Sequence, residues 1–227
     1  LEASGLVIRG GTREGLLVSG EAELRDLVVE DTLPASDGAL GMGVFADGGV
    51  IDAERVIVRR NTYAGILAVR GGSLTLRDAL VSDTTKSSGL EEAGIGLAVD
   101  FGTRAVAERV LVRRSHTTGI QVGEVGTSLV LRDAVIEDTD LSIIGTAIGV
   151  AVILGATLEA ERVLSRRNGN GGITATDPGT TVTVSDIVAR RMDTPSVGTK
   201  GGGMGLVAYD GERLSLALEA GCQGMYD

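Results

Sequence analysis

A nine-residue segment recurs along nearly the whole chain, and this internal repeat limits the fold more than any other feature. Clear copies occupy 24–32, 53–61, 76–84, 107–115, 131–139, 160–168 and 184–192, with a degenerate copy at 3–11. From residue 24 onward the copies start 29, 23, 31, 24, 29 and 24 residues apart, so long and short units alternate. Repeats of roughly 20–50 residues indicate a solenoid, in which each unit stacks only on its neighbours.

Each unit contains three short runs in which apolar residues alternate with variable ones. One run precedes the recurring segment, one is the segment itself, and one begins with glycine, as at 65–68 and 119–122. An alternation with period two predicts strands with one buried face, and no stretch keeps helical spacing. We therefore expect an all-β, right-handed parallel β-helix solenoid of about eight coils with three short strands each. Residues 1–227 form a single β-helix domain, which we expect to be a segment of a longer chain.

The Gly-Ile-x-Val strand at 119–122 and the rhythm of the coils resemble the bacterial right-handed parallel β-helix repeat proteins of the pectate-lyase-like superfamily. The resemblance covers essentially the whole chain. It implies the β-helix fold and a secreted or cell-surface location. It leaves the activity open, because that scaffold hosts polysaccharide lyases, glycosidases, adhesins and inert stalks alike.

The charge and hydropathy of the chain exclude two classes of partner. The formal net charge is −10, whereas binding to nucleic acids or to anionic lipids requires a basic face. The longest apolar run, 143–156, has 14 residues and is interrupted by glycines. A membrane-spanning helix needs about 20 apolar residues. We therefore expect no nucleic-acid partner and no membrane insertion.

The chain has few residues of the kinds that bind metals or cofactors. His116 is the single histidine and Cys222 the single cysteine, so neither a His-rich nor a Cys-rich zinc site can form. Cys222 is either a buried thiol or the partner of a cysteine outside this segment. The glycines at 201–203 lack the Gly-Lys-Ser/Thr order and the following helix of a phosphate-binding loop. We expect no metal and no cofactor.

Charged residues alternate in sign between successive copies of the nine-residue segment. Its third position reads Asp26, Arg55, Asp78, Arg109, Asp133, Arg162 and Asp186, and its eighth reads Asp31, Arg60, Asp83, Arg114, Asp138, Arg167 and Arg191. Equivalent positions are neighbours in a parallel stack, where opposite charges stabilise and like charges destabilise the pairing. We expect a ladder of surface ion pairs, with a charged binding face as the functional alternative. Because arginines would flank each of these carboxylates, we expect no catalytic residues among them.

Every second unit has extra residues at one corner, between the nine-residue segment and the glycine-led strand. These insertions span 33–41, 85–94, 140–148 and 193–203. Insertions on one face of a solenoid often form its binding face, although such loops also simply drape over the body. The candidate residues of this binding edge are Asp37, Lys86, Glu91, Glu92, Asp140, Ser142 and Lys200.

The glycine-led strands also place apolar side chains at outward-facing positions. The candidate apolar contact face comprises Leu17, Phe45, Leu67, Ile153 and Tyr209. A wholly solvated sheet face would be more polar, so either the insertions or a partner chain should cover it. The apolar insertion residues Leu40, Leu90, Ile143 and Ile144 are the cover that we expect.

Regular coils and the lack of a catalytic cluster favour a non-enzymatic structural or binding module, a rigid stalk or adhesin-like surface of an exported bacterial protein. The expected partner is a polysaccharide or another protein, and open strand edges at the ends also permit end-to-end self-association. The alternative is a polysaccharide lyase or glycoside hydrolase relative that acts on an extracellular polysaccharide. The 3 Tyr, 2 Phe and no Trp of the chain disfavour it, because they leave few aromatic platforms for sugars.

Overall fold

A computed structural model describes residues 1–227 except 39, 88–92, 141–146, 191–203, 209–212 and 218–227, and at 204–208 and 213–217 it describes the backbone alone. Within these residues the secondary structure is entirely β and every strand pairs in parallel with its equivalent in the next coil. The predicted parallel β-helix is therefore confirmed.

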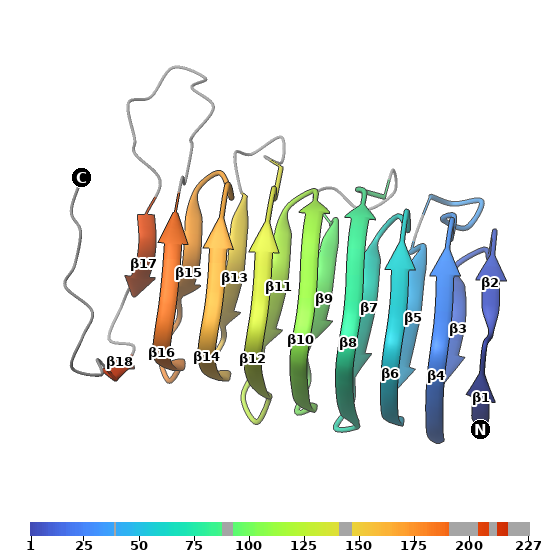
Figure 1. The fold of residues 1–227 in the computed structure, drawn as a ribbon, viewed down its shortest axis with the longest axis horizontal. Helices are drawn as coiled ribbons and strands as arrows, with labels where there is room; N and C mark the ends of the chain where they lie inside the picture. Colours follow the sequence, from blue (N-terminus) through green and yellow to red (C-terminus); the bar gives the residue numbers. More distant parts are fainter. Residues whose placement is uncertain (39, 88–92, 141–146, 191–203, 209–212, 218–227) are drawn as a thin grey trace.

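Two sheets face each other across one core, and we call the one nearer the viewer in Figure 1 the front sheet. Its strands follow the order β1-β4-β6-β8-β10-β12-β14-β16-β18, with β2 also paired to β4. Their bounds are β1 Glu2–Ser4, β2 Val7–Arg9, β4 Glu21–Glu30, β6 Val50–Arg59, β8 Ser73–Thr84, β10 Arg104–Ser115, β12 Ser128–Glu137, β14 Thr157–Arg166, β16 Thr181–Arg190 and β18 Arg213–Ala217.

The back sheet contains the glycine-led strands in the order β3-β5-β7-β9-β11-β13-β15-β17. Their bounds are β3 Glu14–Val18, β5 Met42–Asp47, β7 Ala64–Val69, β9 Ile95–Val99, β11 Thr118–Gly123, β13 Ile148–Ile153, β15 Gly171–Ala175 and β17 Met204–Ala208. The chain rises in the front sheet, crosses to the back sheet, descends there and advances by one coil, which makes the winding right-handed (Figure 1).

The coils differ from the expectation in having two strands where three short ones were predicted. The run before the nine-residue segment and the segment itself form one strand, as in β8, which spans Ser73–Thr84. A residue in the left-handed region, Asp78 with φ 54°, lies in the middle of that strand. A local reversal of the sign of φ bends the backbone without ending the ladder of hydrogen bonds, so the two predicted strands remain one element.

The core is a stack of aliphatic layers in which large and small side chains alternate. The first position of the nine-residue segment forms one such column, in which Leu76 and Leu131 are fully buried and Ala107 lies between them. A small residue on one coil leaves room for the larger side chains above and below it, which keeps the packing dense. This explains how the chain fills its core with hardly any aromatic residues.

The glycine at the second position of each back-sheet strand from β3 to β13 is required by close packing. A Cβ atom built on Gly96 would lie 2.6 Å from the carbonyl oxygen of Gly119 and closer still to Cγ1 of Val112. The equivalent glycines, including Gly65, Gly119 and Gly149, have the same kind of surroundings. Each glycine therefore lets the front sheet approach the back sheet at one corner of the coil.

The insertions leave the solenoid where the sequence places them. They connect β4 to β5, β8 to β9, β12 to β13 and β16 to β17, and so lie along the edge where the chain passes from the front to the back sheet. Two insertions touch, because the Ser87 hydroxyl donates a hydrogen bond to the carbonyl oxygen of Gly38. The count of about eight coils stays a prediction.

Candidate functional site

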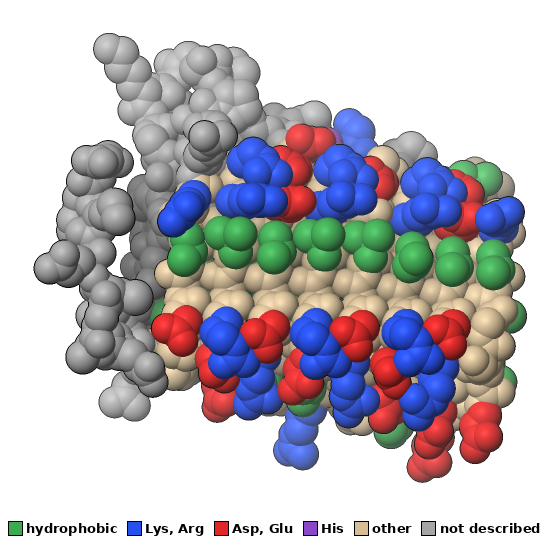
Figure 2. Space-filling model, viewed as in Figure 1, with side chains coloured by type: hydrophobic (Ala, Val, Ile, Leu, Met, Phe, Trp, Pro, Cys, Tyr) green, Lys and Arg blue, Asp and Glu red, His purple; other side chains and the backbone are tan. Residues whose placement is uncertain are grey.

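Two rows of aspartate–arginine pairs run along the front sheet, and Figure 2 shows both. The lower rail consists of the pairs Asp26–Arg55, Asp78–Arg109 and Asp133–Arg162, and the upper rail of Asp31–Arg60, Asp83–Arg114 and Asp138–Arg167. In every pair the arginine Nε lies 2.5–2.7 Å from one carboxylate oxygen and Nη2 donates to the other. The predicted ladder of ion pairs is confirmed.

The rails join coils two by two. Each aspartate pairs with the arginine of the following coil, so Asp78 binds Arg109 of β10. The hydrogen bonds from Arg109 are the main reason why the pKa of Asp78 lies below its ordinary value, and the charge of Arg55 adds to the effect. Since both partners are half-exposed, solvent and salt weaken each pair.

Both partners of each pair adopt a backbone conformation that the sequence analysis did not anticipate. Asp78 and Arg109 have φ of 54° and 53°, in the left-handed region, and the other rail residues share this conformation. Aspartate tolerates this region, but arginine in it costs about 1 kcal/mol. A signal existed in the sequence, because the degenerate copy has Gly5 and Gly10 at these two positions, with φ of 68° and 65°.

An apolar stripe runs between the two rails, one side chain per strand. It consists of Val7, Val28, Ile57, Leu80, Leu111, Val135, Leu164 and Val188, which are aligned in register on adjacent strands. The six inner members are half-exposed, and the terminal Val7 and Val188 are 53% and 39% exposed. In Figure 2 the stripe is the continuous green row between the charged rows.

The stripe and the lower rail border a shallow groove. Its volume is about 530 Å³ where it passes Asp26, Arg55 and Asp78 on one side and Ile57 and Leu80 on the other. This surface was not predicted from the sequence, where only the glycine-led strands were expected to carry outward apolar residues. The available signal was the fifth position of the nine-residue segment, which is apolar although its neighbours on both sides already face the core.

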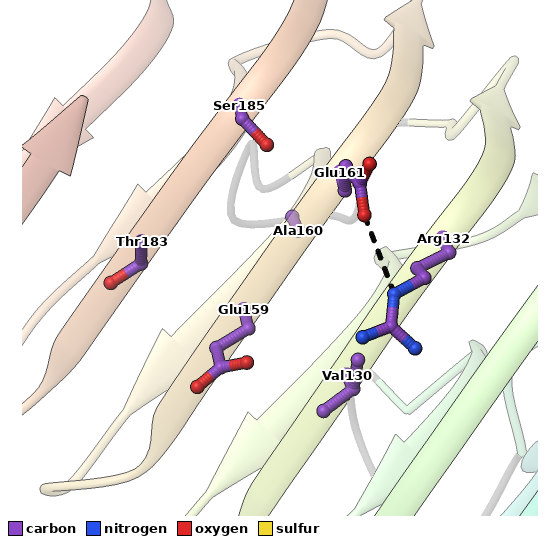
Figure 3. A pocket seen from close by; sticks show the side chains of 7 residues that line it. All are labelled: Val130, Arg132, Glu159, Ala160, Glu161, Thr183 and Ser185. Atoms are coloured by element: carbon purple, nitrogen blue, oxygen red, sulfur yellow. Dashed lines mark ion pairs between the residues drawn. The ribbon is translucent and has the colours of Figure 1, made fainter. Parts of the chain in front are cut away.

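A second, smaller depression lies at the lower end of the front sheet (Figure 3). It has a volume of about 150 Å³ and is lined by Val130, Arg132, Glu159, Ala160, Glu161, Thr183 and Ser185. Arg132 lies 3.4 Å from Glu161 on one side and 3.4 Å from Glu108 on the other. The charge of Arg132 is thus shared across three coils, whereas each pair on the rails joins two.

The predicted binding edge is described only in part. Asp37, Lys86 and Asp140 lie in the insertions at the same edge of the solenoid and are exposed. The remaining candidates Glu91, Glu92, Ser142 and Lys200 lie outside the described residues. The role of this edge in binding therefore stays a prediction.

The predicted apolar contact face lies on the outward side of the back sheet. Leu17, Phe45 and Leu67 are aligned on adjacent strands, with Leu17 53% exposed and the other two half-exposed. Ile153 is half-exposed further along, whereas Tyr209 lies outside the described residues. Of the expected cover, Leu40 is half-exposed, and Leu90, Ile143 and Ile144 lie outside the described residues.

Asp100 is the one described carboxyl group whose pKa is clearly raised. It follows β9 and is only 8% exposed, and this burial raises its pKa to about 6. The Gln121 amide, 3.2 Å from one carboxylate oxygen, and the backbone of Gly123 offset part of the effect, while the charge of Glu124 adds to it. Sequence reasoning gave no reason to single out Asp100.

The described residues contain no group of three or more His, Cys, Asp or Glu side chains that could hold a metal ion. Nor do they include a helix with the length and apolarity needed to cross a bilayer. No family model matches the chain, and neither a curated protein nor a solved structure matches it.

Proposed function

We propose that the chain is a non-enzymatic module, a rigid β-helix whose front sheet presents a binding surface along the apolar stripe. The observation that carries this proposal is the stripe itself, a row of apolar side chains in register from Val7 to Val188 with charged rails on both sides. Exposed apolar patches with a polar rim are typical of interaction sites. The regular spacing favours an extended partner that contacts several coils.

The rails support a binding role over a catalytic one. Glycoside hydrolysis needs one protonated carboxyl and a second carboxylate about 5–9.5 Å away. On the rails, hydrogen bonds from arginine hold the pKa of Asp26, Asp78 and Asp133 below its ordinary value, so these groups stay ionised. Such carboxylates are poor general acids at neutral pH.

The partner that we propose is a polysaccharide or another protein, at the surface of the cell or outside it. The location rests on the resemblance to pectate-lyase-like β-helix proteins alone. End-to-end association is a further proposal. It would pair the end strands of one solenoid with those of another, because open strand edges pair readily with other strands.

The alternative, a lyase or hydrolase acting on a polysaccharide, has one observation in its favour. Asp100, with its pKa near 6, has the protonation behaviour of a general acid. In this alternative Glu124, whose charge helps to raise that pKa, would be the second carboxylate. The site would lie just after the back-sheet strands β9 and β11, where the chain turns toward the front sheet.

A glycan-array screen combined with an activity screen on acidic polysaccharides separates the two proposals. If the chain is a non-enzymatic binding module, replacement of Ile57 and Leu80 by threonine should lower its affinity for the bound glycan at least tenfold. No polysaccharide should be turned over. The matched control replaces Val106 and Val130, which point outward in another column of the same sheet, and should leave binding within about twofold. Turnover that is lost in Asp100→Asn would overturn the non-enzymatic proposal.

A further inference from the structure

The seventh position of the nine-residue segment forms its own column beside the upper rail. In chain order its members are Arg9, Glu30, Arg59, Ser82, Arg113, Glu137, Arg166 and Arg190, aligned in register on adjacent strands. Arginine and glutamate alternate here as on the rails, except where Ser82 takes the place of a glutamate and at the final Arg190.

The two glutamates show what this position does when a carboxylate is present. Glu30 is only 2% exposed, and it accepts hydrogen bonds from Arg9, from Arg59 at 2.6 Å and from Arg60 at 2.8 Å. Glu137 pairs with Arg166 at 2.6 Å and with Arg167 at 2.9 Å. Glu30 therefore gathers arginines from both neighbouring coils, and Glu137 gathers them from the following coil.

Ser82 is flanked by arginines in the same way, without the carboxylate. Its register neighbours are Arg59 on one side and Arg113 on the other, and Ser82 itself is 2% exposed. The Ser82 hydroxyl hydrogen-bonds to Asp83, and both Asp83 oxygens already bind Arg114, at 2.5 and 2.8 Å. Asp83 is thus neutralised by its own partner.

Arg113 is the arginine left over by this substitution. Among the residues that the structure describes it forms no ion pair, and its Nε atom is buried without a hydrogen-bond partner. The register neighbours of Arg113 are Ser82 on one side and Glu137 on the other, and the Glu137 carboxylate is already bound by Arg166 and Arg167. A buried guanidinium donor without an acceptor is destabilising, and an oxyanion is the acceptor that suits its planar fork best.

We propose that an oxyanion, the carboxylate or sulfate group of a ligand, binds beside Ser82 between Arg59 and Arg113. It would take the place that the glutamate carboxylate occupies at Glu30 and Glu137. Leu80 of the apolar stripe lies two residues before Ser82 on the same face of β8. The site therefore adjoins the proposed binding surface, but it does not depend on the proposed function.

The first test measures sulfate binding by calorimetry, and by thermal shift against chloride at equal ionic strength. Arg113→Gln should weaken sulfate binding roughly tenfold or more, because a charge-assisted hydrogen bond is lost. Ser82→Glu should abolish binding and raise the melting temperature, because the variant supplies its own carboxylate. If Ser82→Glu fails to fold, Arg113→Gln alone decides the result.

The matched control is Arg104→Gln, which changes the net charge equally at an exposed position at the start of β10. It should leave sulfate binding within about twofold. Equal loss in Arg104→Gln and Arg113→Gln, or binding retained in Ser82→Glu, would mean an adventitious ion only and would overturn the site.

A second arm identifies the source of the anion by comparing sulfate with an oligogalacturonate of six residues. Tighter binding of the oligosaccharide, lost in Arg113→Gln, assigns the oxyanion to an acidic polymer. Equal affinities, again lost in that variant, assign it to a free anion. Stripe variants that lose glycan binding but keep sulfate binding separate this site from the proposed function.

Discussion

The glycine column of the back sheet leads to the sharpest prediction about stability. In Gly96→Ala the new Cβ would lie 2.6 Å from the carbonyl oxygen of Gly119 and closer still to Cγ1 of Val112. A third clash is with Oγ of Ser115, at 2.8 Å. The Val112 and Ser115 side chains have freedom to move, whereas the carbonyl belongs to the paired strand β11. Overpacking of this kind costs about 1–3 kcal/mol, and we expect the upper end because one of the three clashes is with backbone.

For a domain of this size, a loss of about 3 kcal/mol lowers the melting temperature by roughly 6–12 °C. Urea and thermal denaturation followed by circular dichroism measure both quantities. Gly20→Ala is the matched control, because a Cβ at Gly20 would have no atom within 4 Å and Gly20 has no positive φ. It should change the free energy of unfolding by less than about 0.5 kcal/mol.

A second variant tests the cause of the destabilisation. If the clash with Val112 contributes, the double variant Gly96→Ala/Val112→Ala should be more stable than the sum of the single changes by about 1 kcal/mol. A Gly96→Ala protein as stable as the Gly20→Ala control would refute the reasoning. It would mean that the sheets separate at this corner at no cost.

Three further outcomes are expected. Because burial raises the pKa of Asp100 to about 6, the folded state holds its proton more tightly than the unfolded state, so the contribution of this group to stability should fall by roughly 3 kcal/mol as pH rises from about 4 to 6. The rail aspartates, whose pKa is lowered, act in the opposite direction in both proteins. The free energy of unfolding of the wild type minus that of Asp100→Asn, measured by denaturation across this range, should therefore fall by that amount. Leu131→Ala, at a fully buried position, should lower the free energy of unfolding by about 2–5 kcal/mol. The control Val130→Ala, at an outward-facing position, should lower it by less than about 1 kcal/mol. Equal losses in the two variants would contradict the assignment of Leu131 to the core. Asp78→Asn keeps a side chain that tolerates positive φ but leaves Arg109 without its partner, so the melting temperature should fall more in low salt than in 1 M salt.

The alternation of charge has a consequence for how the coils pair. Each aspartate binds forward to the next coil, so the unit held together by the rails is a pair of coils. A register shift by one coil would place aspartate beside aspartate and arginine beside arginine. The rails are individually weak, yet repeated along the solenoid they favour one order of coils over its alternatives.

The sequence by itself determined the fold and the pairing of charges. The repeat aligns equivalent residues on neighbouring strands, and stacking in register follows from burying the apolar positions of each coil. From this alignment alone, the pairs Asp26–Arg55 and Asp78–Arg109 could be predicted, and the positions of the insertions followed as well. These features depend on the order of residues along the chain and on the alternation of apolar with variable residues. Both can be seen in the amino-acid sequence.

The tertiary structure decided the features that depend on backbone angles and on packing between the two sheets. The left-handed conformation at Asp78 and Arg109 joins two predicted strands into one, and aspartate and arginine do not indicate such a φ as glycine does. The apolar stripe forms because the side chain at the fifth position of the nine-residue segment points outward. This position lies between the left-handed residues at the third and eighth positions, within a run of apolar residues that suggests a buried strand. The burial of Asp100 and the unpartnered Nε of Arg113 depend on which residues of other strands surround them. A local sequence pattern does not show which residues these are.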